Sequence, residues 1–189
     1  GRSAEGLRYI DAVLSVEPDF VGALDWKILI LADLGRVAEA ESLFTKKQGT
    51  HREMNPRLPC ILALQRQDSA EADRLLKEIL KSIQDPKTGP AVIAVSALEL
   101  LPFLARHGKL EEALEILKRD LETPVFPLYD MLVLNPHLEP LRRDPRLKPI
   151  LEKYRENCVE SIRMLAQIRG RGELPPYLET PFTDLLKKL

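Results

Sequence analysis

One spacing pattern occurs three times along the 189-residue chain. A turn residue is followed five positions later by alanine, and four positions after that by a bulky apolar residue. The three sets are Gly35, Ala40 and Phe44; Gln67, Ala72 and Leu76; and Gly108, Ala113 and Leu117. A small residue lets two antiparallel helices cross closely, and a bulky residue one turn later fills the space beside the crossing. The pattern therefore predicts a chain built from helix pairs.

Apolar periodicity favours helices throughout the chain. Apolar residues recur at spacings of three and four, and we find no good run of the strict alternation that is typical of a strand. Hydrophobic residues make up 44% of the chain, which is sufficient for a sizeable core. We predict helices at about 4–16, 20–34, 37–48, 56–66, 69–84, 90–106, 110–122, 126–134, 136–143, 145–169 and 181–188.

Several prolines mark predicted helix starts. Proline suits the first position of a helix, because the N–H that it lacks would have no partner there. A preceding Asn, Asp or Thr can cap the helix by accepting a hydrogen bond from a free backbone N–H. The pairs are Asn55-Pro56, Asn135-Pro136, Asp144-Pro145 and Thr180-Pro181. Pro102 is expected instead to kink the helix predicted at 90–106, because it removes a backbone hydrogen bond in mid-helix.

The helix predicted from Pro145 has the clearest amphipathic pattern. Its apolar face comprises Leu147, Ile150, Leu151, Tyr154, Cys158, Ile162, Leu165 and Ile168. Such a face predicts a helix that lies on a core. Because Cys158 falls within this face, we interpret it as a small buried hydrophobic residue.

The helix pairs resemble tetratricopeptide repeats, whose period is about 34 residues. The Gly–Ala–bulky spacing carries the resemblance, together with Pro18 just before the next pair. The turns lie 32 and 41 residues apart, so these are degenerate repeats, and Gly6 and Ile10 indicate that the chain begins halfway through a repeat. The resemblance implies an all-α, right-handed superhelix of antiparallel helix pairs over 1–125. A C-terminal helical extension and cap over 126–189 would pack on these repeats.

The segment NPHLEPLRRDPRLKPIL, residues 135–151, carries a second resemblance. It is similar to the segment that closes the repeat region of bacterial multidomain regulators, in which helical repeats follow a winged-helix, nucleotide cyclase or serine/threonine kinase domain. The resemblance implies a cytoplasmic, non-catalytic segment for protein–protein interaction within a signalling protein or transcriptional regulator. A free-standing scaffold or assembly protein is one alternative. Another is an accessory domain of a cyclase or kinase whose catalytic part lies elsewhere.

Stacked helix pairs also predict a groove for a protein or peptide partner, because the first helices of successive pairs line a concave surface. The candidate contacts are Asp25, Trp26, Leu29, Arg57, Ile61 and Leu98. These positions are largely aliphatic, which argues against a clamp of Lys, Arg and Asn for the C-terminal carboxylate of a peptide. For Trp26, the only tryptophan, packing in the core is favoured over contact with a ligand.

No catalytic, cofactor or metal site is predicted. His51 and His137 have no Cys, Asp or Glu at ligand spacing, and His107 lies at a predicted helix C-terminus. The chain lacks H-E-x-x-H, G-x-S-x-G and C-x-x-C motifs and a glycine-rich phosphate loop. Its two cysteines, Cys60 and Cys158, are too few for a disulfide framework.

Neither nucleic acid nor membrane is predicted as a partner. Residues 142–171 carry nine basic and four acidic side chains, but Glu152 with Arg155 and Glu160 with Arg163 are spaced as surface ion pairs on a solvated helix face. The net charge of −1 gives no electrostatic signature for nucleic acid. No apolar run approaches the roughly 18 residues that a membrane helix needs.

The C-terminal tail carries a short amphipathic pattern. Its apolar residues are Tyr177, Leu178, Phe182, Leu185 and Leu186. The end of a solenoid must cover its apolar face, so we expect the tail to cap the last exposed helices. The alternative is a partner contact or a homodimer contact through Tyr177, Phe182 and Leu185.

Overall fold

The computed structural model of the chain describes residues 3–50, 55–122 and 128–176. Within these ranges the protein is all-helical and has no β-strand, which confirms the predicted all-α class. The elements are α1 (Ser3–Val16), α2 (Val21–Asp33), α3 (Val37–Thr50), α4 (Arg57–Gln65), α5 (Ser69–Gln84), α6 (Pro90–Arg106), α7 (Leu110–Glu122), α8 (Tyr129–Leu134), the 3-10 helix η1 (Pro136–Leu138), α9 (Glu139–Arg142) and α10 (Leu147–Gly170). The helix predicted at 181–188 lies outside the described residues.

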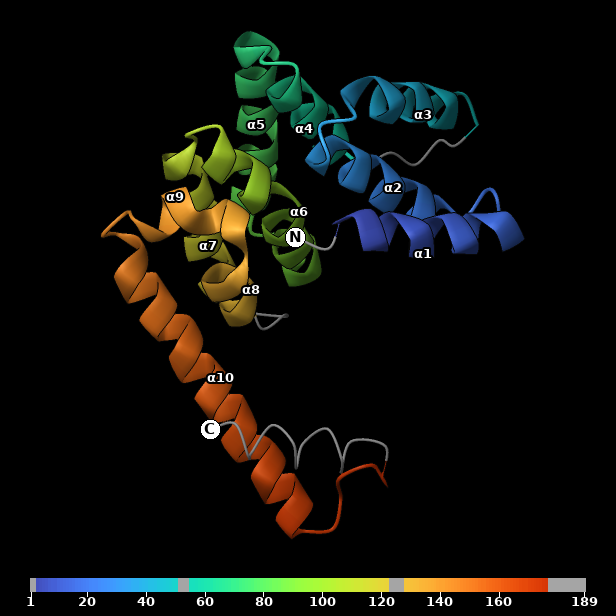
Figure 1. The fold of residues 1–189 in the computed structure, drawn as a ribbon. Coiled ribbons are helices and arrows are strands. Elements are labelled where there is room, and N and C mark those ends of the chain that lie inside the picture. The colour runs from blue at the N-terminus through green and yellow to red at the C-terminus, as the bar shows by residue number, and fades with distance from the viewer. Residues whose placement is uncertain (1–2, 51–54, 123–127, 177–189) are drawn as a thin grey trace.

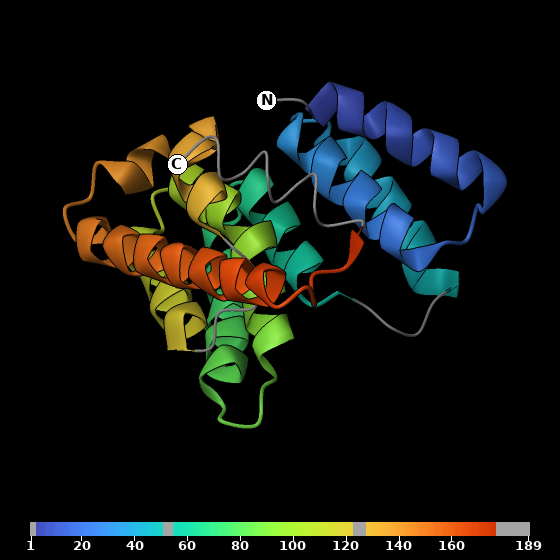
Figure 2. The same ribbon diagram turned by 90° about the horizontal axis from the view of Figure 1, so that it is seen from below.

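Consecutive helices pack in pairs (Figure 1). Helix α2 packs on both α1 and α3, α4 packs on α5, and α6 packs on α7. Helix α4 also contacts α2 and α6, while α5 contacts α7, so the pairs α4–α5 and α6–α7 stack in two layers. Helix α3 packs on α4. The C-terminal elements η1 and α9 lie on α6, and α10 crosses α7, α8 and α9 before it extends away from the body (Figures 1 and 2).

The three predicted turns end their helices in the same way. Gly35, Gln67 and Gly108 all adopt the left-handed backbone, with φ of 73°, 62° and 72°. In each turn the next residue donates its N–H to a carbonyl five positions earlier, which is the Schellman arrangement. The three bonds are Arg36 N to Leu31 O at 2.9 Å, Asp68 N to Ala63 O at 3.0 Å, and Lys109 N to Leu104 O at 2.9 Å. The shared helix stop gives each pair the same tight connection.

The small residues after these turns lie at close helix crossings, as predicted. Ala40, Ala72 and Ala113 are fully buried. The Cys60 thiol of α4 lies 3.9 Å from the Ala72 carbonyl oxygen of α5, which shows how closely one backbone approaches the other helix. The bulky residues that follow are buried at Leu76 and Leu117 and partly buried at Phe44.

The described Asx-Pro pairs close hydrogen-bonded turns at helix starts. The Oδ1 atom of each Asx accepts the backbone N–H of the residue after the proline: Asn55 from Arg57 at 3.0 Å, Asn135 from His137 at 2.9 Å, and Asp144 from Arg146 at 2.9 Å. The 3-10 helix η1 begins at Pro136 with Asn135 as its N-cap, as predicted, whereas α4 and α10 begin after Pro56 and Pro145 and not at them. The fourth pair, Thr180-Pro181, lies outside the described residues.

One further helix prediction needs correction. The helix predicted at 136–143 is divided into η1 and α9. The division occurs at Pro140, whose missing N–H interrupts a continuous α-helix. Helix α6 spans Pro90–Arg106 with Pro102 in its interior, which confirms the predicted bounds, and the kink expected at Pro102 stays a prediction.

One apolar core joins the helix pairs to the C-terminal elements, because it runs from Ile28 in α2 to Tyr154 in α10. Only the first part of the predicted α10 face belongs to it: Leu147, Ile150 and Tyr154 are buried. The later residues of the face, from Cys158 onward, are only partly buried, because α10 extends away from the body there (Figure 1). The expectation that Cys158 is a buried core residue is therefore corrected.

A hydrogen bond to a buried carboxyl group links α10 to α7. Asp120 has no exposed surface, and its Oδ2 atom accepts a hydrogen bond from the Tyr154 hydroxyl at 2.6 Å. Its Oδ1 atom has no hydrogen-bond partner among the residues that the structure describes. Burial raises the pKa of Asp120, and the Tyr154 hydrogen bond opposes this rise only in part.

Asp120 should make the stability of the protein fall as the pH rises. The folded protein holds the Asp120 proton more tightly than the unfolded chain, whose Asp pKa is about 3.9. The contribution of the group is therefore greatest below about pH 4 and is lost as the pH rises through the raised folded-state pKa. We expect Asp120→Asn to abolish this loss, which urea unfolding between pH 4 and pH 8 measures. The exposed Asp19→Asn is the control, and an unchanged pH dependence in Asp120→Asn would contradict the assignment.

Candidate partner-binding groove

An apolar groove of about 480 Å³ lies where α2 and α6 face α8 and η1. It is lined by Ser3, Trp26, Leu29, Ile30, Asp33, Leu98, Glu99, Pro102, Phe103, Asp130, Met131, Leu134, Asn135, Pro136 and His137. Helical spacing explains two of its walls. The lining residues of α2 lie at positions 26, 29, 30 and 33, and those of α6 lie at positions 98, 99, 102 and 103. Residues three or four positions apart lie on the same face of a helix, so each set forms a single stripe along its helix.

The structure brings together three of the six predicted groove residues. Trp26, Leu29 and Leu98 line the groove. Leu29 is nevertheless almost completely buried, so its contribution is to the floor. The interpretation of Trp26 as a core residue is wrong, because 43% of its surface is exposed. Trp26 therefore offers a large aromatic surface at the groove.

The other three predicted residues serve the packing of the helices. Asp25 forms an ion pair with the buried Lys47 of α3. Ile61 has no exposed surface and belongs to the core. Arg57 donates from Nε to Glu99 Oε2 at 2.5 Å and so joins α4 to α6. None of these three residues lines the groove.

Asp33 ties four segments together at the rim of the groove. Its Oδ2 atom accepts a hydrogen bond from Ser3 Oγ at 2.5 Å. Its Oδ1 atom lies 3.2 Å from Nη2 of Arg106 and 3.4 Å from Nε2 of His137. The guanidinium of Arg106 also stacks over the ring of Phe103, at 4.8 Å from its centroid. One carboxylate thus connects the start of α1, the end of α2, the end of α6 and η1.

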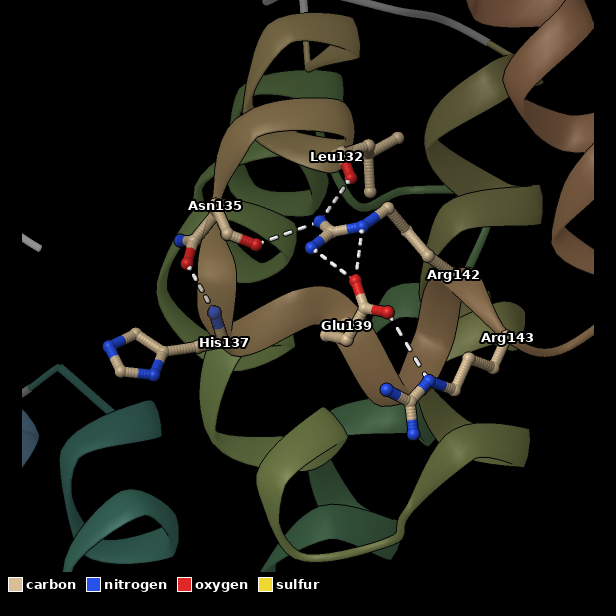
Figure 3. A network of polar contacts seen from close by, with 6 residues as sticks. All are labelled: Leu132, Asn135, His137, Glu139, Arg142 and Arg143. Carbon is tan, nitrogen blue, oxygen red and sulfur yellow. Dashed lines mark hydrogen bonds and ion pairs between the residues drawn. The ribbon is translucent and has the colours of Figure 1, made fainter.

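Arg142 holds the opposite wall in place (Figure 3). Its Nη1 atom donates to the carbonyl oxygens of Leu132 at 3.0 Å and Asn135 at 2.8 Å, where α8 ends. A cation at this end of a helix also meets the negative end of the helix dipole. Glu139 holds the guanidinium through bonds of 3.1 Å and 2.9 Å, while the imidazole of His137 points away from this network (Figure 3). The closing segment 135–142 therefore forms a fixed wall.

The contacts among Ser3, Asp33 and His137 differ from those of a nucleophilic triad. In a triad the histidine lies between the serine and the carboxylate, so that it can take the hydroxyl proton. Here Asp33 lies between the other two and accepts a hydrogen bond from the serine hydroxyl directly.

The described residues contain no group of three or more His, Cys, Asp or Glu side chains that could hold a metal ion. Burial also raises the pKa of the Cys60 thiol to about 12, so this thiol stays protonated at neutral pH.

A second hollow, of about 650 Å³, runs along α10 and has a different character. The described residues that line it all belong to this one helix, and most of them are charged. Lys153 pairs with Glu156 and Arg155 with its predicted partner Glu152, whereas the predicted pair of Glu160 with Arg163 is not formed among the described residues. Arg146 is likewise paired with Asp144 and Glu111. These pairs agree with the predicted solvated face.

Sequence reasoning missed most of the wall that the C-terminal elements provide. Met131, Leu134 and Pro136 line the groove beside His137, and their place opposite α2 depends on a fold-back over about a hundred residues. The tail residues Tyr177, Phe182 and Leu185 lie outside the described ranges, so their predicted contact stays a prediction.

Within the described ranges, no helix combines the length and apolar character needed to cross a membrane. Comparisons of the chain with protein-family models, curated proteins and solved structures find no match.

Proposed function

We propose that this chain is a non-catalytic interaction segment that binds an apolar stretch of a partner protein in the groove between α2, α6 and α8. The exposed apolar surface of the groove carries the proposal. Trp26 is 43% exposed and Leu134 is 73% exposed, and both line the same hollow. Clustered exposed apolar residues are typical of interaction sites, and aromatic residues often supply much of the binding energy.

The fixed walls of the groove support the same function. Asp33 and Arg142 hold the two sides through polar contacts before any partner arrives. A preformed site loses less conformational entropy on binding, so more of the contact energy becomes affinity. The groove therefore suits recognition of a segment that inserts apolar side chains.

The arrangement of the helix pairs supports a tetratricopeptide-like superhelix as part of this proposal. The repeated helix stops at Gly35, Gln67 and Gly108 and the two-layer packing are what such an array requires. The closing segment 135–142 is also a wall of the groove, so a bound partner would touch both the repeats and the segment that follows them. In a larger bacterial regulator, this arrangement would let the partner's presence reach an attached output domain.

Peptide selection followed by substitution of Trp26 tests the proposal. A random peptide library displayed on phage is selected on the immobilised chain, and dissociation constants of synthetic copies are measured by calorimetry. We expect Trp26→Ala to weaken binding at least about tenfold, because it removes the main exposed aromatic surface of the groove. Tyr9→Ala is the matched control, since Tyr9 is an exposed helical aromatic residue outside the groove. Equal affinity for wild type and both variants would contradict the proposed site.

A further inference from the structure

The groove has an unbalanced set of charged side chains. The described residues that line it include the three carboxylates of Asp33, Glu99 and Asp130 but no lysine or arginine. Two of these carboxylates are occupied within the protein. Asp33 contacts Arg106 at 3.2 Å, and Glu99 accepts from Arg57 at 2.5 Å and also from Asn55 at 2.9 Å.

Asp130 is the carboxylate that remains available. It lies in the first turn of α8, is exposed, and makes no hydrogen bond or ion pair with the residues that the structure describes. Its neighbour Met131 and the exposed Leu134 belong to the apolar lining on the same helix. The groove thus places one unpaired negative charge beside an apolar surface.

We infer that the occupant of the groove is an apolar peptide segment carrying a lysine or arginine that pairs with Asp130. The inference rests on the proposed function and adds the charge of the partner. A lysine or arginine of the peptide would form an ion pair with Asp130. The apolar contacts beside this pair would exclude part of the solvent that otherwise screens it. A peptide that presents a carboxylate at this position would face the unpaired carboxylate of Asp130, and the described lining residues include no lysine or arginine to pair with it, so the groove disfavours acidic segments.

Charge reversal at Asp130 tests this inference. The displayed random library is selected in parallel on the wild-type chain, on Asp130→Lys and on Asp19→Lys, where Asp19 is exposed and lies outside the groove. We expect wild type and Asp19→Lys to select apolar peptides rich in Lys or Arg, and Asp130→Lys to lose this preference. Wild-type-selected peptides should bind Asp130→Asn about three- to tenfold more weakly, and the difference should shrink at high salt.

The possible results separate this inference from the proposed function. Peptides that depend on Trp26 but are neutral or acidic would overturn the charge assignment alone. An unchanged basic preference in Asp130→Lys would overturn it as well. If no selected peptide depends on Trp26, the proposed groove itself fails. Sedimentation velocity on the same samples tests whether the chain forms a dimer. A dimer that is lost in Trp26→Ala would mean that a second copy of the chain occupies the groove, and this result would overturn the inference.

Discussion

Replacing Ala72 with tryptophan is expected to lower the free energy of unfolding by about 3 kcal/mol or more. Ala72 has no exposed surface and lies where α5 crosses α4, with its carbonyl oxygen 3.9 Å from the Cys60 thiol. An indole at this point must separate the two helices, because a packed interior has no void of that size. Urea unfolding followed by circular dichroism measures the loss.

Ala70→Trp is the matched control for this prediction. Ala70 belongs to the same helix, two positions earlier, and is exposed. An exposed substitution away from special features usually changes stability by less than about 0.5 kcal/mol. Equal unfolding midpoints for the two variants would show that Ala72 does not lie at a close helix crossing.

Removal of the Glu99 carboxylate is expected to lower the free energy of unfolding by about 3 kcal/mol. Glu99 is buried and accepts hydrogen bonds from Arg57 and Asn55, so Glu99→Ala leaves a largely buried guanidinium without its partner. The loss of one member of a buried ion pair is more costly than the pair itself is stabilising. Glu99→Gln should cost less, because its amide oxygen can still accept from Arg57 and Asn55.

Two comparisons isolate this effect in the same denaturation assay. The double substitution Arg57→Met with Glu99→Leu should recover most of the lost stability, since it removes both charges together. Glu41→Ala breaks the more exposed pair between Glu41 and Arg66 and should cost less than about 1 kcal/mol. A loss in Glu99→Ala no greater than that in Glu41→Ala would show that the buried pair does not hold α4 against α6.

Local sequence signals predicted most of the helices and the three turns that follow α2, α4 and α6. Gly35 and Gly108 can adopt the left-handed backbone without strain, and the alanine five positions later marks each close crossing. Gln67 has no such freedom, and it was found because the spacing to Ala72 and Leu76 matched the other two sets. The Asx-Pro pairs were also located from local sequence, since their hydrogen bonds involve residues only two positions apart.

The groove was predicted only in part, because its composition depends on distant contacts. Trp26 was interpreted as a core residue, but the fold leaves 43% of its surface exposed at the groove. His137 has no acidic residue at ligand spacing in sequence, yet the fold places it 3.4 Å from Asp33. Arg57 was expected to face a partner, whereas Glu99, distant in sequence, occupies its guanidinium. Such pairings follow from how α2, α4, α6 and η1 meet, which periodicity within one helix does not specify.

The most direct test of the proposed groove is acrylamide quenching of Trp26 fluorescence with and without a saturating selected peptide. Trp26 is the only tryptophan in the chain, so the emission reports on this one position. Because its side chain lines the groove and is 43% exposed, a peptide bound there should shield it and lower the quenching constant. An unchanged quenching constant at full peptide occupancy would show that the partner binds elsewhere and would contradict the account.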